Sequence, residues 1–232
     1  MPRGRRIAPP GLAQHIINRG NDRKAVFRKP GDYLAFLRYM FDAQISVPLR
    51  ILAFCLMPNH FHLVVWPECV EVLSAFMHDL MNAHVHRYQQ HYGTVGHGHI
   101  WQSRFKNFPI QHDLHLLRVL RYVEANAARA SLVARAEDWS WGSLARPCDP
   151  HWPVLTPSPV PRPENWVDQV NAYVAGKELR RIRQSVRRCT PYGEPAWTER
   201  VAKEYGLEGT LRRLGRPRKE DDESDSLIVL GA

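Results

Sequence analysis

Residues 49–66 contain two apolar, strand-like segments joined by a very short connection, and this pair restricts the fold more than any other feature. The first segment is Leu49 to Leu56, the connection is Met57-Pro58-Asn59, and the second segment is Phe61 to Trp66, which Pro67 ends. Two strands this close in the chain pair as an antiparallel hairpin. The fold must therefore contain an antiparallel sheet.

The segments on either side of this hairpin alternate between strand-like and helix-like patterns. Strands are expected at Gln14–Asn18 and Phe105–Ile110, and helices at Asp32–Ala43, Val70–Tyr92 and Leu114–Ala130. The helices follow from apolar side chains that recur every three or four residues. The order β-α-β-β-α-β predicts an α+β protein of ferredoxin-like arrangement, with two helices on one face of the sheet. The additional helix is then free to cover the other face.

The composition changes after residue 145. We divide the chain into a first domain over residues 1–145, a proline-rich linker over 146–163, a helical basic appendage over 164–219 and an acidic tail over 220–232. Within the appendage, Glu164–Ser185 has a helical pattern and Trp197–Leu214 predicts two short helices. We expect the linker to be extended and the tail to be poorly ordered.

The chain carries a formal net charge of +9, and its basic residues are concentrated at Met1–Pro30 and Gly176–Glu220. A basic excess at both ends favours a polyanionic partner, and nucleic acid is favoured over a membrane surface because no amphipathic anchor accompanies the charge. A hydrophobic content of 44% over 232 residues indicates a folded globule and excludes a disordered chain.

The cysteines are scattered and give no paired motif. They are Cys55, Cys69, Cys148 and Cys189. This spacing argues against a zinc knuckle and against a disulfide framework. The basic N-terminus lacks the apolar core of a signal peptide, and no apolar run reaches the length of a membrane span. We therefore expect a protein of the reducing cytoplasm.

Two histidines stand two positions apart at the start of the second hairpin strand. Side chains alternate between the faces of a strand, so His60 and His62 project from the same face. Two imidazoles on one face can bind a single divalent metal ion. Taken alone, the pair is explained better by core histidines with hydrogen-bond partners.

A tyrosine and an asparagine four residues apart share a face of the helix expected at Leu114–Ala130. If this helix lies across the sheet face of the histidines, Tyr122 and Asn126 meet the imidazoles there. Two neutral imidazoles and one amide oxygen leave an ion its full charge and room for substrate, which favours Mg²⁺ or Mn²⁺ over a closed Zn²⁺ site. On helical spacing alone, an amphipathic-helix tyrosine and a helix-end cap explain the pair better.

Five segments resemble, in order, the REP-associated tyrosine transposases of the HUH single-tyrosine superfamily, over residues 10 to 145. They are His15-Ile16-Ile17-Asn18-Arg19-Gly20-Asn21, Met57-Pro58-Asn59-His60-Phe61-His62-Leu63, Trp101-Gln102-Ser103-Arg104-Phe105, Arg121-Tyr122-Val123-Glu124-Ala125-Asn126 and Asp138-Trp139-Ser140-Trp141. The resemblance implies an enzyme that nicks and rejoins single-stranded DNA at hairpin-forming repetitive extragenic palindromes. It also favours a monomer over a homodimer and a nucleoid-associated location in a bacterial cytoplasm.

The resemblance implies a role for each of the four site residues. His60, His62 and Asn126 would bind the divalent metal, and Tyr122 would form a 5′-phosphotyrosine bond while releasing a 3′-OH. No nucleotide cofactor is implied, and the chain has no Walker-type glycine loop. The chain departs from the family where Ala127, and not proline, follows Asn126, so the helix need not bend there.

Basic and aromatic residues near the motifs are expected to contact DNA. The candidates for phosphate contacts are Arg19, Arg23, Lys24, Arg104 and Lys106, those for stacking on an unpaired base are Trp101 and Phe105, and those for a minor groove are Arg216 and Arg218. These expectations follow from charge and from the stacking of bases on aromatic rings.

Two other functions fit the same composition. A protein that binds hairpin DNA without cutting it would need neither the histidine pair nor Tyr122. A metal-dependent DNA hydrolase would use water as the nucleophile and would leave Tyr122 structural. Both alternatives remain open at the level of sequence.

Overall fold

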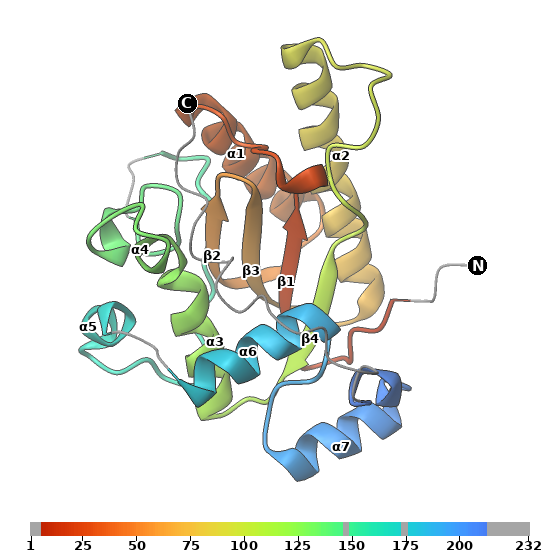
Figure 1. Ribbon diagram of the computed structural model, residues 1–232, viewed down its shortest axis with the longest axis vertical. Helices are drawn as coiled ribbons and strands as arrows, with labels where there is room; N and C mark the ends of the chain where they lie inside the picture. Colours follow the sequence, from red (N-terminus) through yellow and green to blue (C-terminus); the bar gives the residue numbers. More distant parts are fainter. Residues whose placement is uncertain (1–5, 146–148, 173–175, 213–232) are drawn as a thin grey trace, which may run out of the picture.

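The computed structural model describes residues 6–145, 149–172 and 176–212, and it contains one four-stranded antiparallel sheet (Figure 1). The strands are β1 (Ala13–Arg19), β2 (Arg50–Met57), β3 (His60–Trp66) and β4 (Lys106–Ile110), and they lie in the order β2-β3-β1-β4. The hairpin predicted from sequence is formed by β2 and β3, which pair from Arg50–Trp66 to Met57–His60.

Two long helices cover one face of the sheet. They are α1 (Pro30–Ser46) and α2 (Val70–Tyr92), which pack against each other. Alternate strand residues such as Phe54, Phe61 and Leu63 point into this layer and are fully buried. The ferredoxin-like α+β arrangement predicted from the element order is therefore confirmed.

The opposite face is covered by α3 (Leu114–Glu124), as expected for the additional helix (Figure 1). The buried side chains of α3 and its successor form one core with Cys55, Val64 and Phe108 of the sheet. The molecule is thus layered as helices, sheet and helices, and the side chains of β3 are divided between two separate cores.

The prediction of one continuous helix over Leu114–Ala130 is wrong. Helix α3 ends at Glu124, Ala125 has φ −77° and ψ 0°, and a short helix α4 (Asn126–Arg129) follows. A carbonyl in the last turn of a helix has no partner within that helix. Here the Arg129 guanidinium donates a hydrogen bond of 3.2 Å to the Tyr122 carbonyl. The bend therefore forms without proline, because a side chain satisfies the helix end.

The described part of the proline-rich segment is held against the sheet. The edge strand β2 pairs with it, since the Thr156 amide donates to the Ile51 carbonyl at 2.7 Å. Nearer the end of β2, the Leu56 amide donates to the Trp141 carbonyl at 2.9 Å and the Ser143 amide donates to the Phe54 carbonyl at 2.9 Å. These bonds satisfy backbone groups that an exposed edge would leave unpaired.

The appendage covers the other sheet edge. The Tyr192 amide donates to the Pro109 carbonyl of β4 at 2.9 Å, and the Gln111 amide donates to Tyr192 at 3.0 Å. The helices here are α5 (Trp166–Asn171), α6 (Lys177–Arg188) and α7 (Pro195–Glu204), with a short 3₁₀ turn at Glu208–Thr210. The single helix predicted over Glu164–Ser185 is therefore two helices. The expected acidic tail at 220–232 lies outside the described residues.

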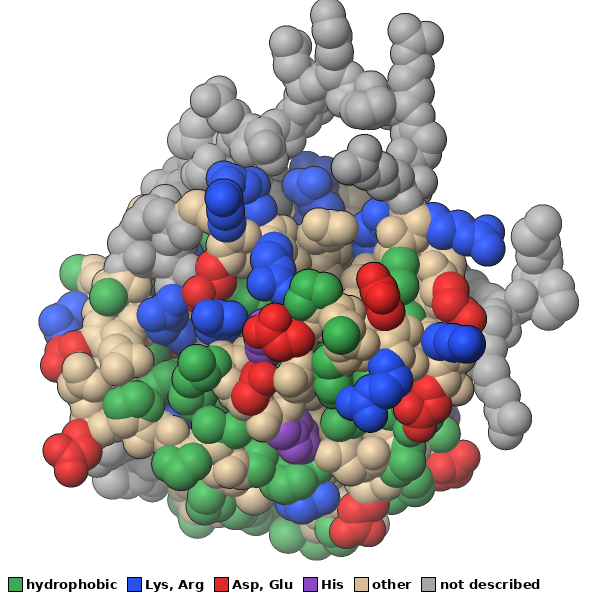
Figure 2. Space-filling view, turned by 90° about the horizontal axis from the view of Figure 1, so that it is seen from below, with side chains coloured by type: hydrophobic (Ala, Val, Ile, Leu, Met, Phe, Trp, Pro, Cys, Tyr) green, Lys and Arg blue, Asp and Glu red, His purple; other side chains and the backbone are tan. Residues whose placement is uncertain are grey.

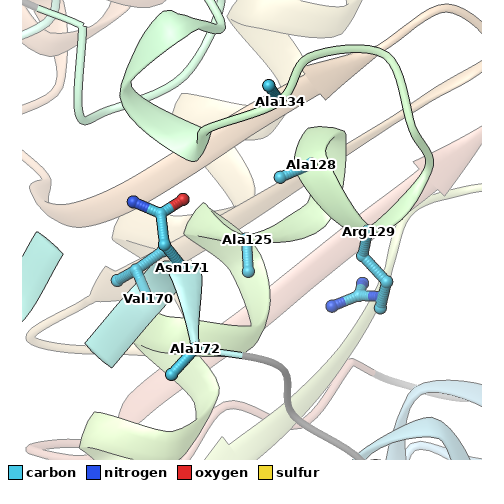
Figure 3. Close-up of a pocket in the computed structure, with 7 residues that line it drawn as sticks. All are labelled: Ala125, Ala128, Arg129, Ala134, Val170, Asn171 and Ala172. Atoms are coloured by element: carbon cyan, nitrogen blue, oxygen red, sulfur yellow. The ribbon is translucent and has the colours of Figure 1, made fainter. Parts of the chain in front are cut away.

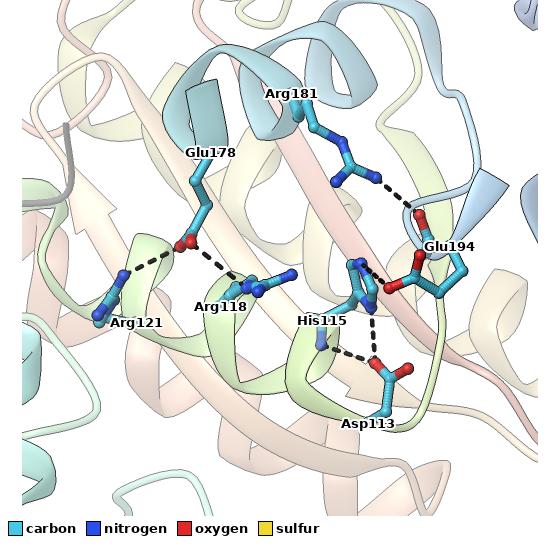
Figure 4. A network of polar contacts seen from close by, with 8 residues as sticks. Asp113, His115, Arg118, Arg121, Glu178, Arg181 and Glu194 are labelled. Atoms are coloured by element: carbon cyan, nitrogen blue, oxygen red, sulfur yellow. Dashed lines mark hydrogen bonds and ion pairs between the residues drawn. The ribbon is translucent and has the colours of Figure 1, made fainter. Parts of the chain in front are cut away.

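Helix α6 is tied to the helix α3 by ion pairs (Figure 4). Glu178 contacts Arg118 at 3.3 Å and Arg121 at 3.0 Å. In the first turn of α3, His115 Nδ1 lies 2.8 Å from Asp113 Oδ1, and His115 Nε2 lies 3.6 Å from Glu194 Oε1. Because Leu179 and Ile182 of α6 are also part of the α3 core, the first part of the appendage belongs to the same folded body as α3.

A buried histidine in the α1–α2 layer has neither ring nitrogen bonded. His84 is 1% exposed, and the rings of Phe27, Phe36 and Trp101 surround it. Burial, with a smaller effect of the Arg87 charge, lowers the pKa of His84 to about 3. The folded protein therefore keeps this imidazole neutral at a pH where the unfolded chain protonates it.

We expect His84→Leu to stabilise the protein more at about pH 5 than at about pH 7.5. His84 is protonated below about pH 6.5 in the unfolded chain but only below about pH 3 in the folded protein. The wild-type protein therefore loses stability as the pH falls from about 6.5 to about 3. The difference between the two pH values should be about 2 kcal/mol in the free energy of unfolding, measured by urea denaturation. The exposed His86→Leu on the same helix is the control. Equal effects of His84→Leu at both pH values would contradict this prediction.

Candidate active site

The two histidines of β3 lie on the sheet face that α3 covers. In the strand pairing, His62 stands opposite Ile17 and His60 stands opposite Arg19 of β1. The His60 and His62 ring centroids are 5.0 Å apart. His62 is 2% exposed, while His60 is half-buried at the rim. The hairpin turn that precedes them is fixed by the Val26 and Phe27 amides, which both donate to the Pro58 carbonyl.

Tyr122 of α3 reaches this pair. Its ring centroid lies 5.6 Å from that of His62, with the two rings nearly perpendicular at 88°. The tyrosine is 6% exposed and Asn126, at the start of α4, is 7% exposed. The structure thus brings together a phenol and an imidazole, Tyr122 and His62, that the sequence places 60 residues apart.

A third histidine, which the sequence analysis did not assign, completes the cluster. His15 of β1 is fully buried, stacks on Phe108 and forms a hydrogen bond of 2.8 Å between its Nε2 and His62 Nδ1. Strand alternation places His15 on the same face as Ile17, which pairs with His62. To assign His15 to the site, one must know the register of β1 against β3, which the sequence alone does not give.

The hydrogen bonds of the two β3 histidines leave the same nitrogen open on each. His60 Nδ1 lies 2.6 Å from Asn59 Oδ1, and an amide oxygen only accepts, so His60 carries its proton on Nδ1. His62 Nδ1 is engaged by His15. Both Nε2 atoms are therefore the nitrogens left to bind a metal ion, the arrangement that metal-ligating histidines use.

Burial keeps all three imidazoles neutral. It lowers the pKa of His15 to about 3 and, together with Arg19 and Arg129, the pKa of His60 to about 3. For His62, burial and the neighbouring histidines hold the pKa well below its ordinary value. A neutral imidazole is the form that coordinates a metal.

Asn126 is oriented by Arg129, a residue that the sequence analysis did not single out. The guanidinium Nη2 donates to Asn126 Oδ1 at 2.6 Å, and its carbon lies 4.3 Å from the Tyr122 ring centroid. Asn126 Nδ2 is buried and has no hydrogen-bond partner within the described part of the chain. The Asn126 amide oxygen therefore already accepts a hydrogen bond from a cationic side chain.

A small pocket of about 140 Å³ lies beside α4 (Figure 3). Its walls are Ala125, Ala128, Arg129, Ala134, Val170, Asn171 and Ala172. The Asn171 amide is already used, since it accepts from the Ala136 amide at 2.8 Å and donates to Glu137 at 2.7 Å. Arg129 is thus the charged wall of this pocket.

The residues of the site fit a divalent ion held by nitrogen and amide oxygen. Within residues 6–145, 149–172 and 176–212, no group of three or more His, Cys, Asp or Glu is placed to hold a metal. The set that remains is the Nε2 atoms of His60 and His62 with Asn126 Oδ1, and the Nδ1 atoms of both histidines are already held. Such a set is open, because it leaves coordination positions for other oxygens.

The predicted phosphate contacts lie around the rim. Arg19 is half-buried beside His60, and Arg23, Lys24, Arg104 and Lys106 are exposed. Arg216 and Arg218 lie outside the described residues. Figure 2 shows Lys and Arg side chains gathered mostly over one half of the face seen from below, interspersed with acidic ones. The described helices include none that is both long and apolar enough to cross a membrane.

The two aromatic residues predicted to stack on a base are not equivalent in the structure. Trp101 is 6% exposed and packs against Phe61 at 5.4 Å, so it belongs to the α1–α2 core and offers no open ring face. This burial corrects the stacking role expected for Trp101. Phe105 is half-buried, and the Arg6 guanidinium lies 3.2 Å from its ring centroid.

Comparison with known proteins identifies relatives of this fold. The family model described as "Transposase IS200 like" matches residues 10–126, which is half of the chain. A solved structure of a REP-associated tyrosine transposase bound to a REP hairpin matches with a TM-score of 0.50 and 19% identity, covering 62% of this chain and 82% of that one. A search of curated proteins found no match. These matches confirm the resemblance inferred from the sequence motifs.

We expect His60 to remain neutral and protonated on Nδ1 from about pH 8 to about pH 5. The Asn59 oxygen fixes the proton on Nδ1, and the lowered pKa of about 3 keeps the ring from taking a second one. Long-range ¹H–¹⁵N NMR spectra of the metal-free protein measure both properties. Asn59→Ala should allow both tautomers, and a wild-type His60 that titrates near 6.5 would contradict the assignment.

Proposed function

The chain belongs to the family of IS200-like transposases, and we propose that it nicks and rejoins single-stranded DNA at hairpin-forming palindromes, with Tyr122 as the nucleophile. One observation carries the proposal. The Tyr122 ring lies 5.6 Å from that of His62, and the rings of His62 and His60 are 5.0 Å apart. A protein that only bound DNA would have no need of a phenol and an imidazole pair at this distance.

The proposed reaction exchanges one phosphodiester for another. The Tyr122 oxygen attacks phosphorus and loses its proton, an O–P bond forms, and the bond to the 3′ oxygen breaks as that oxygen takes up a proton. The product is a 5′-phosphotyrosine with a free 3′-OH. Attack by a 3′-OH on the phosphotyrosine rejoins the strand and restores the phenol. The bond energy is conserved, so no nucleotide cofactor is required.

The donor set of the site supports a divalent ion, Mg²⁺ or Mn²⁺, held by His60, His62 and Asn126. Once bound, such an ion neutralises charge on a non-bridging phosphate oxygen and orients the phosphorus. The chain itself supplies the geometry. His15 and Asn59 hold the two Nδ1 atoms at 2.8 and 2.6 Å, and the buried β3 backbone keeps the imidazoles on one face.

The DNA partner is proposed from charge and from the similar structure, whose protein is bound to a REP hairpin. Arg19 at the rim, with Arg23, Lys24, Arg104 and Lys106 around it, would contact phosphates of the single strand. The resemblance to the family favours a monomer, in which Tyr122 would act beside the histidines of its own chain. A role on DNA further supports a nucleoid-associated location.

One observation favours a second candidate. Tyr122 is 6% exposed and Arg129 covers its ring, so a hydrolase that used water and kept Tyr122 structural would also account for a buried phenol. The two mechanisms differ in the product. Only transesterification to Tyr122 leaves DNA covalently attached to the protein.

We expect the protein to form a covalent adduct with labelled hairpin oligonucleotides whose single-stranded flanks are randomised, in the presence of Mg²⁺ or Mn²⁺. Denaturing gels measure the adduct. Tyr122→Phe should abolish it, a loss of several orders of magnitude, because the nucleophile is absent. Chelation of the metal should suppress it.

Tyr39→Phe on α1 is the matched control, since this half-buried tyrosine lies on the opposite side of the sheet. Cleavage that survives Tyr122→Phe would establish the hydrolase. Specific hairpin binding without any cleavage would establish a DNA-binding protein without catalysis.

We expect His15→Phe to lower the affinity for Mn²⁺ by about 10- to 100-fold, the usual cost of removing the hydrogen-bond partner of a metal-ligating histidine. Phenylalanine can still stack on Phe108, but it leaves His62 Nδ1 without its partner at 2.8 Å. Isothermal titration calorimetry measures the affinity. His84→Phe removes a buried histidine from the other face and should leave Mn²⁺ binding unchanged. Equal affinities for His15→Phe and wild-type protein would refute the role of His15.

A further inference from the structure

The outer side of helix α6 carries a row of arginines. Arg180 and Arg187 are exposed and Arg183 is half-buried, and their spacings of three and four residues place them on one side of the helix. The row extends about 10 Å along the helix axis. The opposite side of α6 packs into the α3 core through Leu179 and Ile182. The arginine row therefore lines the surface of the molecule.

Helix α6 is strongly basic as a whole. Its twelve residues include six basic ones and one acid, Glu178. That acid is directed at α3, where it contacts Arg118 at 3.3 Å and Arg121 at 3.0 Å (Figure 4). The carboxylate of α6 thus serves the contact between the two helices, on the side away from the arginine row. The outer side of α6 presents positive charge to a partner.

The C-terminal end of α6 lies against β4, beside Lys106. Cys189 follows the last turn of the helix. Burial raises the pKa of its thiol, while the charge of Lys106 and a hydrogen bond from the Asn107 amide lower it in part. Lys106 is the first residue of β4 and is exposed. Figure 1 shows the same arrangement, with α6 running from α3 towards β4. The arginine row therefore leads to Lys106.

Lys106 belongs to the same row of the sheet as His62. It pairs with Ile17 of β1, which pairs in turn with His62 of β3. Residues directly opposite each other on antiparallel strands project from the same face. Neighbouring strands are about 4.8 Å apart, so the backbones of Lys106 and His62 are about 10 Å apart. A basic path therefore leads from α6 over Lys106 to the histidines beside Tyr122.

The residue types of α6 suit the backbone of a DNA duplex. Double-stranded DNA carries one negative charge per about 1.7 Å of its axis, and an arginine fork can bind two oxygens of one phosphate. Proteins that bind flexible single strands stack the bases on aromatic rings. The residues Lys177–Arg188 of α6 include no aromatic side chain. The helix therefore fits a rigid row of phosphates better than it fits unpaired bases.

Resting on the proposed function, we propose that α6 binds the phosphate backbone of the hairpin stem, and that the strand leaving the stem passes over Lys106 to Tyr122. Contacts to phosphates fix the position of a protein on DNA without reading the sequence. The stem contacts of α6 thus determine which part of the flanking strand reaches Tyr122. In this arrangement α6 contributes affinity for the stem and none for the single strand.

The experiment measures binding of the full chain to labelled oligonucleotides by fluorescence anisotropy, in the presence of a chelator. One oligonucleotide is a DNA hairpin with randomised single-stranded flanks, and the other is a randomised single strand of the length of one flank. Arg180→Gln/Arg187→Gln should weaken hairpin binding by about tenfold or more and leave single-strand binding unchanged. The slope of log K against log salt concentration should decrease by about two for the hairpin, because two phosphate contacts are removed.

Two further variants control for folding and for net charge. Arg180→Lys/Arg187→Lys keeps both charges and should retain most of the hairpin affinity. The single variant Arg187→Gln is compared with Arg38→Gln, which removes an equal charge from α1, where Arg38 pairs with Asp149 at 3.4 Å. Only Arg187→Gln should lower the hairpin affinity and its salt slope.

Three outcomes would overturn the proposal. One is an Arg180→Gln/Arg187→Gln protein, folded by circular dichroism, that binds the hairpin as tightly as the wild-type. Another is an equal loss for the hairpin and the single strand, which would make α6 a general surface for polyanions. The third is tighter binding of an RNA hairpin of the same sequence, which would replace DNA by RNA as the partner. The proposed function fails separately, through the absence of a Tyr122-dependent adduct, since binding in a chelator does not depend on cleavage.

Discussion

The register in which β1 pairs with β3 determines the whole site. This pairing places His62 opposite Ile17, so that His15 lies on the same face, within 2.8 Å of His62. A slip of one residue would turn every side chain of a strand to the other face. Phe61, Leu63 and Val65 would then face α3, and the histidines would face the aromatic core of α1 and α2. The apolar residues of β3 therefore fix the register on which the imidazoles depend.

The helix that carries the phenol is held from both sides. Val119, Leu120 and Val123 bury it against the sheet, while Glu178 of α6 bridges Arg118 and Arg121 on its outer side. Most of the energy comes from the apolar contacts, because partly exposed ion pairs contribute little. The ion pairs instead connect α6 to the outer side of α3. Tyr122 is thus placed by the core, and the appendage packs against the helix that carries it.

The sequence predicted the sheet and the long helices because their periodicities are strong. Strand alternation at His60 and His62 and the four-residue spacing of Tyr122 and Asn126 allowed a shared site, and the resemblance to the transposase family led us to expect one. The bend at Ala125 was not predictable, because it depends on Arg129 reaching back to a carbonyl seven residues earlier. His15 was missed for a related reason, since its role depends on a strand register. Trp101 was expected to stack on a base, although its indole lies in the core.

The broken helix and the charge of the site have the same origin. If α3 had continued straight through Ala125, the Tyr122 carbonyl would accept a hydrogen bond from a backbone amide, and it would not need Arg129 as a donor. Because the helix ends there, the Tyr122 carbonyl accepts from the Arg129 guanidinium. The same guanidinium lies over the Tyr122 ring and donates to Asn126 Oδ1. The family that this chain resembles usually has proline after the asparagine, and a proline there removes a backbone donor. With Ala127 in that position, this chain depends on the arginine for both the bend and the electrostatics, so the two properties cannot be changed independently at residue 129.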